Sequence, residues 1–147
     1  MATIERAIEI ALEAHRGQVD KAGQPYILHP LRLMLKMASE TEMITAVLHD
    51  VVEDSSWTLQ ELRGEGFSGE VIAAVDCLTH REGESYQVYL ERICRNPIAV
   101  KVKLADLEDN LDIRRLDALN RKDTERLNQY LRAYRQLQGI ARGAPSE

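Results

Sequence analysis

Apolar residues recur along most of the chain at the spacing of three and four positions that is typical of an amphipathic helix. In residues 4–15 they fall on one helical face, and Gly17 follows as a stop signal. Two more segments, residues 31–38 and about 123–139, repeat the pattern. We therefore expect an all-α fold, organised as a compact multi-helix bundle.

One expected helix, over about residues 42–52, is apolar nearly all round, which indicates a central position in the bundle. It is preceded by an irregular loop over residues 18–28 and by Pro30, which is suited to the first position of a helix. Another apolar helix is expected over about residues 98–111. Further helix starts are marked by residues that cap helices or break the chain: Thr58 with Glu61, Ser68, Ser85 and Asn96–Pro97.

The composition is that of a soluble globular protein rather than a disordered or disulfide-stabilised one. Of the 147 residues, 44% are hydrophobic and 29% are charged. No apolar run approaches the roughly 20 residues of a membrane helix, and acids inside the first apolar pattern exclude a signal peptide. Two distant cysteines, Cys77 and Cys94, suit a reducing compartment. We expect one domain over residues 1–147, located in the cytoplasm and not associated with a membrane.

Charge is unevenly distributed along the chain, whose net charge is −5. Residues 1–113 are rich in Asp and Glu, whereas residues 114–142 carry more Arg and Lys than acids. A pI of about 5.4 argues against nucleic acid as a partner, because such binding depends on neutralising phosphates. The basic segment is suited either to an anionic substrate or to pairing with the acidic part of the chain. Tyr and Leu residues in this segment are only a weak sign of self-association, so the sequence leaves the oligomeric state open.

Four ionisable residues stand at the end of the most apolar helix: His49-Asp50, followed one turn later by Glu53-Asp54. The partial negative charge at a helix C-terminus disfavours carboxylates by several tenths of a kcal/mol each, and burial adds to this cost. A divalent cation bound there would reverse the penalty. This cluster is therefore a candidate metal site.

Two further residues have comparable settings: His29 stands before a predicted helix, and Asp106 lies near the end of an apolar run. With His49 and Asp50 they offer two nitrogens and two carboxylates. That set suits Mn²⁺, Fe²⁺ or Zn²⁺ and leaves positions open for water and a phosphate oxygen.

Several motifs occur in the order of a known family. They are Ala14-His15-Arg16-Gly17-Gln18, Gly23-x-Pro25-Tyr26-Ile27-x-His29-Pro30, Leu48-His49-Asp50-Val51-Val52-Glu53-Asp54, Leu78-Thr79, and Lys103-Leu104-Ala105-Asp106 with Asn110. Over about residues 4–113 the chain resembles the hydrolase domain of RelA/SpoT-type alarmone enzymes, most of all the stand-alone small alarmone hydrolases. The resemblance implies the HD superfamily of metal-dependent phosphohydrolases.

The resemblance also implies a reaction and a set of site residues. The matched positions are His29, His49, Asp50 and Asp106 for the metal, usually Mn²⁺, Glu53 and Asp54 for the attacking water, and Lys21 and Asn110 for the substrate. The implied reaction removes pyrophosphate from the 3′ position of (p)ppGpp, so the expected partner is a phosphorylated nucleotide. Because the resemblance leaves no room for a separate synthetase domain, we expect a chain that only degrades.

Three departures from the family pattern affect the substrate contacts. The loop that usually reads R-K-S-G is Asp20-Lys21-Ala22-Gly23, and a common Arg-Lys pair aligns with Gln87-Val88. The arginine, leucine and histidine that usually follow the metal-binding aspartate are replaced by Leu107-Glu108-Asp109. These changes remove expected cations near the substrate, which Arg114 and Arg115 of the basic segment could replace.

Other interpretations fit parts of the same sequence. The chain could be an HD phosphohydrolase for a different phosphoester, or a non-catalytic module that binds a nucleotide or a partner protein. Glu53 and Asp54 could form a solvated helix end, Lys21 could be an ordinary surface lysine, and Asn110 could cap a helix. His15, on an apolar helical face, is expected to be a structural hydrogen-bonding histidine.

Overall fold

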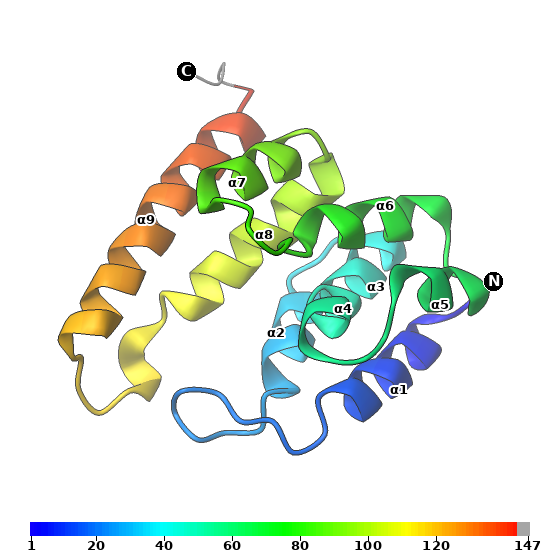
Figure 1. Ribbon diagram of the computed structural model, residues 1–147, viewed down its shortest axis with the longest axis horizontal. Coiled ribbons are helices and arrows are strands. Elements are labelled where there is room, and N and C mark those ends of the chain that lie inside the picture. Colours follow the sequence, from blue (N-terminus) through cyan, green and yellow to red (C-terminus); the bar gives the residue numbers. More distant parts are fainter. Residues whose placement is uncertain (144–147) are drawn as a thin grey trace.

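The computed structural model describes residues 1–143, and these fold almost entirely into helices (Figure 1). The helices are α1 (Ile4–Ala14), α2 (Leu28–Leu35), α3 (Glu40–Leu48), α4 (Val51–Asp54), α5 (Leu59–Gly64), α6 (Gly69–Leu78), α7 (Tyr86–Cys94), α8 (Pro97–Asn110), the 3₁₀ helix η1 (Ile113–Arg115) and α9 (Arg121–Ala141). Within the described residues, β structure is limited to an isolated bridge between Val19 and Pro25. The all-α, multi-helix expectation is confirmed.

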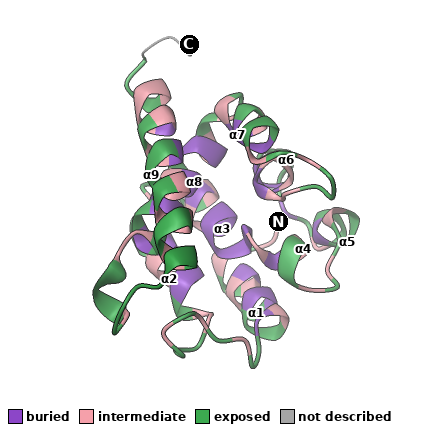
Figure 2. Cartoon of the chain, turned by 60° about the vertical axis from the view of Figure 1, so that its left-hand side comes forward, coloured by how far each residue is buried: buried purple, intermediate pink, exposed green. Residues whose placement is uncertain are grey.

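Helix α3 is central, as its apolar circumference predicts. It packs against α1, α2, α6 and α8, and Figure 2 shows it mostly buried among its neighbours. Ala46 belongs to a core cluster built largely from α6, α7, α8 and α9, whereas Val47 and Leu48 belong to a second cluster built from α1, α5 and α6. Because α3 contributes to both clusters, its C-terminal end is held rigidly inside the bundle.

Helix α9 lies along α8 on one side of the molecule (Figure 1). Ala133 and Leu137 of α9 are buried in the cluster that also contains Leu107 of α8. Among residues 1–143, no helix combines the length and the apolar character needed to cross a bilayer.

The helix expected over residues 42–52 is wrong in its extent, because it is broken at His49 and Asp50. The Nδ1 atom of His49 donates to the carbonyl oxygen of Ala46 at 2.7 Å. Asp50 then adopts φ −108° and ψ 2°, outside the helical region. Side-chain bonding to the backbone competes with the helical ladder in this way and ends α3 before α4 begins. The break turns both side chains toward the interior.

Two other boundaries differ from the sequence prediction. Helix α2 begins at Leu28, so Pro30 lies inside its first turn, where the missing N–H has no intrahelical partner to lose. Helix α9 extends beyond the expected 123–139, because Asn120 and Asp123 form a capping box at its start and the helix continues past Gly139. The remainder of the tail, residues 144–147, and with it the end of the expected 1–147 domain, lies outside the described residues.

Candidate metal centre

All four predicted metal ligands meet at one point in the interior. His29 comes from the first turn of α2, Asp106 from α8, and His49 and Asp50 from the junction of α3 and α4. The Nε2 atom of His29 lies 2.8 Å from Oδ1 of Asp106. The Nε2 atom of His49 lies 3.5 Å from the same oxygen and 3.0 Å from Oδ2 of Asp50. Ligand atoms of His29, His49 and Asp50 all lie within 4.8 Å of one another.

Each histidine is oriented by a hydrogen bond from Nδ1, the ring nitrogen that faces away from the centre. The Nδ1 atom of His29 hydrogen-bonds Oδ2 of Asp109 at 2.6 Å, and Nδ1 of His49 donates to Ala46. With Nδ1 carrying the hydrogen, Nε2 of each ring presents a lone pair to the centre, the usual arrangement of metal-ligating histidines. His49 Nε2 is buried and makes no hydrogen bond among the described residues. Because the carboxylates beside it are also acceptors, a cation is the partner that suits all four groups.

The electrostatics of the cluster favour positive charge at its centre. Burial lowers the pKa of His49, yet the charges of Asp50 and Asp106 outweigh it and raise that pKa well above its ordinary value. Burial also raises the pKa of Asp50, but the charge of His49 brings the net value down to about 2. In the metal-free protein, a second proton on each imidazole would thus offset the charge of the carboxylates. A divalent cation would displace those protons on binding.

Neighbouring side chains orient the two carboxylates. The hydroxyl of Tyr26 donates to Oδ2 of Asp50. On Asp106, Oδ2 accepts from Lys103 Nζ at 2.7 Å and Oδ1 accepts from Asn110 Nδ2 at 3.2 Å. Lys103 is only 9% exposed, and its Nζ lies 5.3 Å from the centroid of the Tyr89 ring. Two carboxylates with fixed rotamers are the preorganised ligands that a metal site requires.

Helix α4 places Glu53 and Asp54 beside this cluster, where both are exposed. Partial burial and the charge of Asp50 raise the pKa of Asp54 to about 6. Partial burial likewise raises the pKa of Glu53, although the backbone N–H of His80 donates to Glu53 Oε1 at 2.7 Å and acts in the opposite direction. A carboxylate with a pKa near 6 can accept a proton from water close to neutral pH.

Lys21 and Asn110 lie on one cavity of about 320 Å³ that adjoins the cluster. Tyr26 and Asn110 line it and also contact Asp50 and Asp106, so they connect the cavity with the predicted ligands. Asn110 is the last residue of α8 and does not cap it, because Leu111 occupies the cap position. The remaining lining residues come from the 19–22 loop, η1 and the start of α9: Val19, Asp20, Ala22, Asp112, Arg115, Leu116, Arg126, Leu127 and Tyr130.

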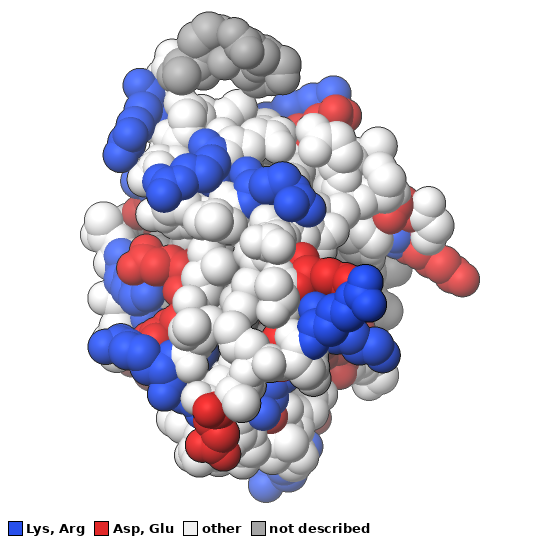
Figure 3. Space-filling model, turned by 90° about the vertical axis from the view of Figure 1, so that its left-hand side faces the viewer, with Lys and Arg blue, Asp and Glu red and all other residues white. Residues whose placement is uncertain are grey.

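The basic segment contributes to this cavity through Arg115 and Arg126 rather than through Arg114. The Arg114 side chain is 87% exposed and pairs with Asp112 at 2.8 Å, and it does not line the cavity. Arg126 does, although it also pairs with Asp123 at 2.7 Å. On the side of the molecule where α9 lies, Lys and Arg form separate groups with acids beside several of them, not one continuous basic surface (Figure 3).

The departures from the family pattern have distinct structural outcomes. Asp20 stabilises its own loop, since its Oδ1 accepts from the backbone N–H groups of Ala22 and Gln24, each at 2.9 Å. Gln87 lines a different cavity. His15 is buried and pairs with Gln18 through Nδ1 at 2.9 Å, as expected of a structural histidine.

Sequence reasoning missed Lys103, Asp109 and Arg126 as contributors to this region. Lys103 and Asp109 stand three residues before and after Asp106, a spacing that places all three on one face of α8. That periodic signal was available in the sequence. Arg126 had no comparable signal, because its place depends on how α9 packs against α8.

Comparison with known proteins found sequence relatives and similar solved structures, while no family model matches the chain. It is 34% identical over 120 residues to the guanosine-3′,5′-bis(diphosphate) 3′-pyrophosphohydrolase of Aquifex aeolicus, a match that covers 74% of this chain and 17% of that protein. It is 35% identical over 121 residues to the GTP pyrophosphokinase of Streptomyces coelicolor, which covers 74% of this chain and 14% of that protein. The chain therefore spans only a small part of the length of these relatives.

The structural match covers far more of both molecules. A solved structure of a metazoan ortholog of SpoT, described as hydrolysing ppGpp, superimposes with a TM-score of 0.76 and 24% identity. The match covers 99% of this chain and 89% of that one, so the two share a fold. The chain is thus a relative of the RelA/SpoT-type enzymes and resembles their HD-type hydrolase domain.

Proposed function

We propose that this protein is a divalent-metal-dependent phosphohydrolase that removes pyrophosphate from the 3′ position of (p)ppGpp or a closely related nucleotide. The observation that carries the proposal is the convergence of two imidazole Nε2 atoms and two carboxylates beside a cavity with cationic side chains. The activity in the names of relatives from Aquifex aeolicus and Haemophilus influenzae supports this choice of substrate. A cytoplasmic location, suggested by two free cysteines, is part of the same proposal.

His29, His49, Asp50 and Asp106 would hold the ion. We propose Mn²⁺, with Fe²⁺ or Zn²⁺ as the alternatives that the same ligands accept. When bound, such an ion polarises phosphoryl oxygens and lowers the pKa of water toward about 7.

Glu53 and Asp54 handle the proton of the attacking water. The reaction breaks the bond between the 3′ oxygen and phosphorus, the water oxygen joins the departing pyrophosphate, and the 3′ oxygen leaves with a proton. Asp54, whose pKa is raised to about 6, is largely ionised at neutral pH and still basic enough to accept the water proton. Glu53, fixed by the His80 N–H, is suited to orienting the water.

The nucleotide occupies the cavity that Lys21 and Asn110 line. Partial burial and the positive charge of Arg126 lower the pKa of Lys21, so two cations stand close together there. With Arg115 they form a cationic rim suited to phosphate oxygens outside the scissile group. Leu127 and Tyr130 give the same cavity an apolar wall for the base.

The test is hydrolysis of ppGpp by protein loaded with Mn²⁺, with GDP and pyrophosphate separated by anion-exchange chromatography. Asp50→Asn and Glu53→Gln should each lower the rate by at least about 100-fold. The matched control is Asp117→Asn, an exposed acid outside the site, which should keep full activity. Failure of the Mn²⁺-loaded protein to turn over any nucleotide would refute the proposal, and nucleotide binding without turnover would indicate a non-catalytic module.

A different phosphorylated nucleotide is the second candidate substrate, and the observation that favours it is Asp20. Its carboxylate lines the cavity where the alarmone pattern has an arginine, so it changes the charge presented to the base. A panel of nucleotides assayed with Mn²⁺ separates the candidates. A kcat/KM for another member at least tenfold above that for ppGpp would favour the second.

A further inference from the structure

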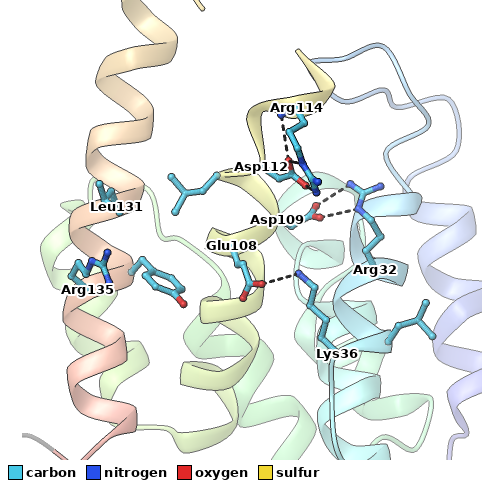
Figure 4. Close-up of a pocket in the computed structure, with 11 residues that line it drawn as sticks. Arg32, Lys36, Glu108, Asp109, Asp112, Arg114, Leu131 and Arg135 are labelled. Carbon is cyan, nitrogen blue, oxygen red and sulfur yellow. Dashed lines mark hydrogen bonds and ion pairs between the residues drawn. The ribbon is translucent and has the colours of Figure 1, made fainter. Parts of the chain in front are cut away.

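Asp109, in the last turn of α8, lies between the predicted metal ligand His29 and a groove on the surface. Its side chain is 6% exposed. Oδ2 accepts from His29 Nδ1 at 2.6 Å and from Arg32 Nη2 at 2.9 Å, and Oδ1 accepts from Arg32 Nε at 2.8 Å. Figure 4 shows Arg32 reaching across from α2 to meet Asp109 at the edge of this groove.

A third residue connects Asp109 with the nucleotide cavity. Arg115 Nη2 donates to the backbone oxygen of Asp109 at 3.0 Å, and Arg115 Nη1 lies 3.5 Å from its Oδ1. Arg115 also lines the cavity. Asp109 is therefore the shared acceptor of a metal-ligand imidazole and of two guanidinium groups.

We propose that Asp109 is a positioning residue that fixes His29 in the tautomer and orientation required of a metal ligand. An ionised carboxylate only accepts hydrogen bonds, so the His29 nitrogen facing it must carry the hydrogen. The opposite nitrogen, Nε2, lies 2.8 Å from Asp106 Oδ1 and is then the nitrogen available to bind a metal ion. Arg32 holds the carboxylate in place through two parallel hydrogen bonds. This inference rests on the proposed metal binding.

Asp109 is also one of the departures from the family pattern, and its position in the fold gives that departure a structural role. Histidine is usual at this position in the RelA/SpoT-type motif, and its replacement suggests a lost substrate contact. In the fold, Asp109 instead points at His29, and the charge that it introduces is balanced by Arg32. Asp109 and Arg32 thus work as a pair.

Asparagine is the sharpest replacement for Asp109, because it keeps the shape and removes the charge. The amide of asparagine replaces one of the two carboxylate oxygens by an NH₂ group, which cannot accept a hydrogen bond. In one orientation the NH₂ group faces the donors His29 Nδ1 and Arg32 Nη2, and in the other it faces the donor Arg32 Nε. The control is Glu108→Gln, a neighbouring carboxylate that is 61% exposed and 3.6 Å from Lys36 (Figure 4). Mn²⁺ affinity is measured by isothermal titration calorimetry, with circular dichroism to verify folding.

Asp109→Asn should weaken Mn²⁺ binding about 10- to 100-fold, the usual effect of losing such a partner, and Glu108→Gln should stay within twofold of wild type. At saturating Mn²⁺, kcat should return to within about threefold, because the ligands themselves are unchanged. A folded Asp109→Asn protein with wild-type Mn²⁺ affinity would overturn the inference. If that variant does not fold, Arg32→Gln decides: several-fold weaker binding supports the inference, and unchanged binding overturns it. Failure of the wild-type protein to bind Mn²⁺ would instead refute the proposed function.

Discussion

Replacement of Asp54 by Asn should stabilise the metal-free protein while abolishing most of its activity. Partial burial and the charge of Asp50 raise the pKa of Asp54 from the ordinary 3.8 to about 6. The carboxyl therefore binds its proton more tightly in the folded state than in the unfolded state. Ionisation of Asp54 penalises folding progressively as the pH rises above about 4, and the penalty is complete above about pH 6. Asparagine carries no such penalty.

The size of the effect follows from the pKa difference. About two pKa units correspond to about 3 kcal/mol. Because Asp54 is an exposed residue, solvent screening reduces the expected gain to about 1 to 1.5 kcal/mol. For a chain of this length, that corresponds to a rise in melting temperature of about 2–5 °C.

The assay is thermal unfolding followed by circular dichroism in the presence of a chelator, between pH 4 and pH 8. The Asp54→Asn protein should melt above wild type at pH 7.5, and the difference should shrink toward zero near pH 4. Asp117→Asn, at an exposed position outside the site, should show no such pH-dependent gain. A variant that is equally stable or less stable than wild type at pH 7.5 would show that ionisation of Asp54 does not destabilise the fold.

Three further predictions concern the substrate cavity, a metal ligand and the core. Arg115→Gln should raise the KM for ppGpp about tenfold in steady-state kinetics. Arg114→Gln should leave the KM unchanged, because the Arg114 side chain is 87% exposed and outside the cavity, so equal effects of the two variants would contradict a substrate contact by Arg115. Tyr26→Phe removes the donor to Asp50 and should weaken Mn²⁺ binding about tenfold by calorimetry, so an unchanged affinity would exclude an orienting role. Leu137→Ala, at a fully buried position of α9, should lower the free energy of unfolding by about 2–5 kcal/mol in urea titrations, and a loss below 1 kcal/mol would show that α9 is not part of the core.

Much of the fold could be predicted from the sequence because its signals are local. Ser68, Ser85 and Asn96 cap the helices that they were expected to cap, each by accepting a backbone N–H within the next three residues. The break between α3 and α4 could not be predicted in the same way. It depends on the side-chain bond of His49 to a backbone carbonyl, which competes with a strongly apolar helical pattern.

In the candidate site, too, some residues could be identified from the sequence and others could not. His29, His49, Asp50 and Asp106 were identifiable because ionisable residues in apolar settings are costly without a partner. Asp109 shares a helical face with Asp106, a signal that the sequence contains, but its burial against His29 is not visible in periodicity. Arg126 had no such signal, since the packing of α9 on α8 cannot be deduced from periodicity. From the sequence, Asp109 was interpreted as the loss of a substrate contact, whereas in the fold its carboxylate accepts a hydrogen bond from His29.

That His29, His49, Asp50 and Asp106 together hold a divalent ion is tested most directly by a crystal structure of the protein soaked with Mn²⁺ and measured for anomalous scattering. One strong peak is expected about 2.0 to 2.3 Å from His29 Nε2, His49 Nε2 and carboxylate oxygens of Asp50 and Asp106. A structure in which the centre holds no peak at saturating Mn²⁺, or in which Mn²⁺ binds elsewhere, would contradict it.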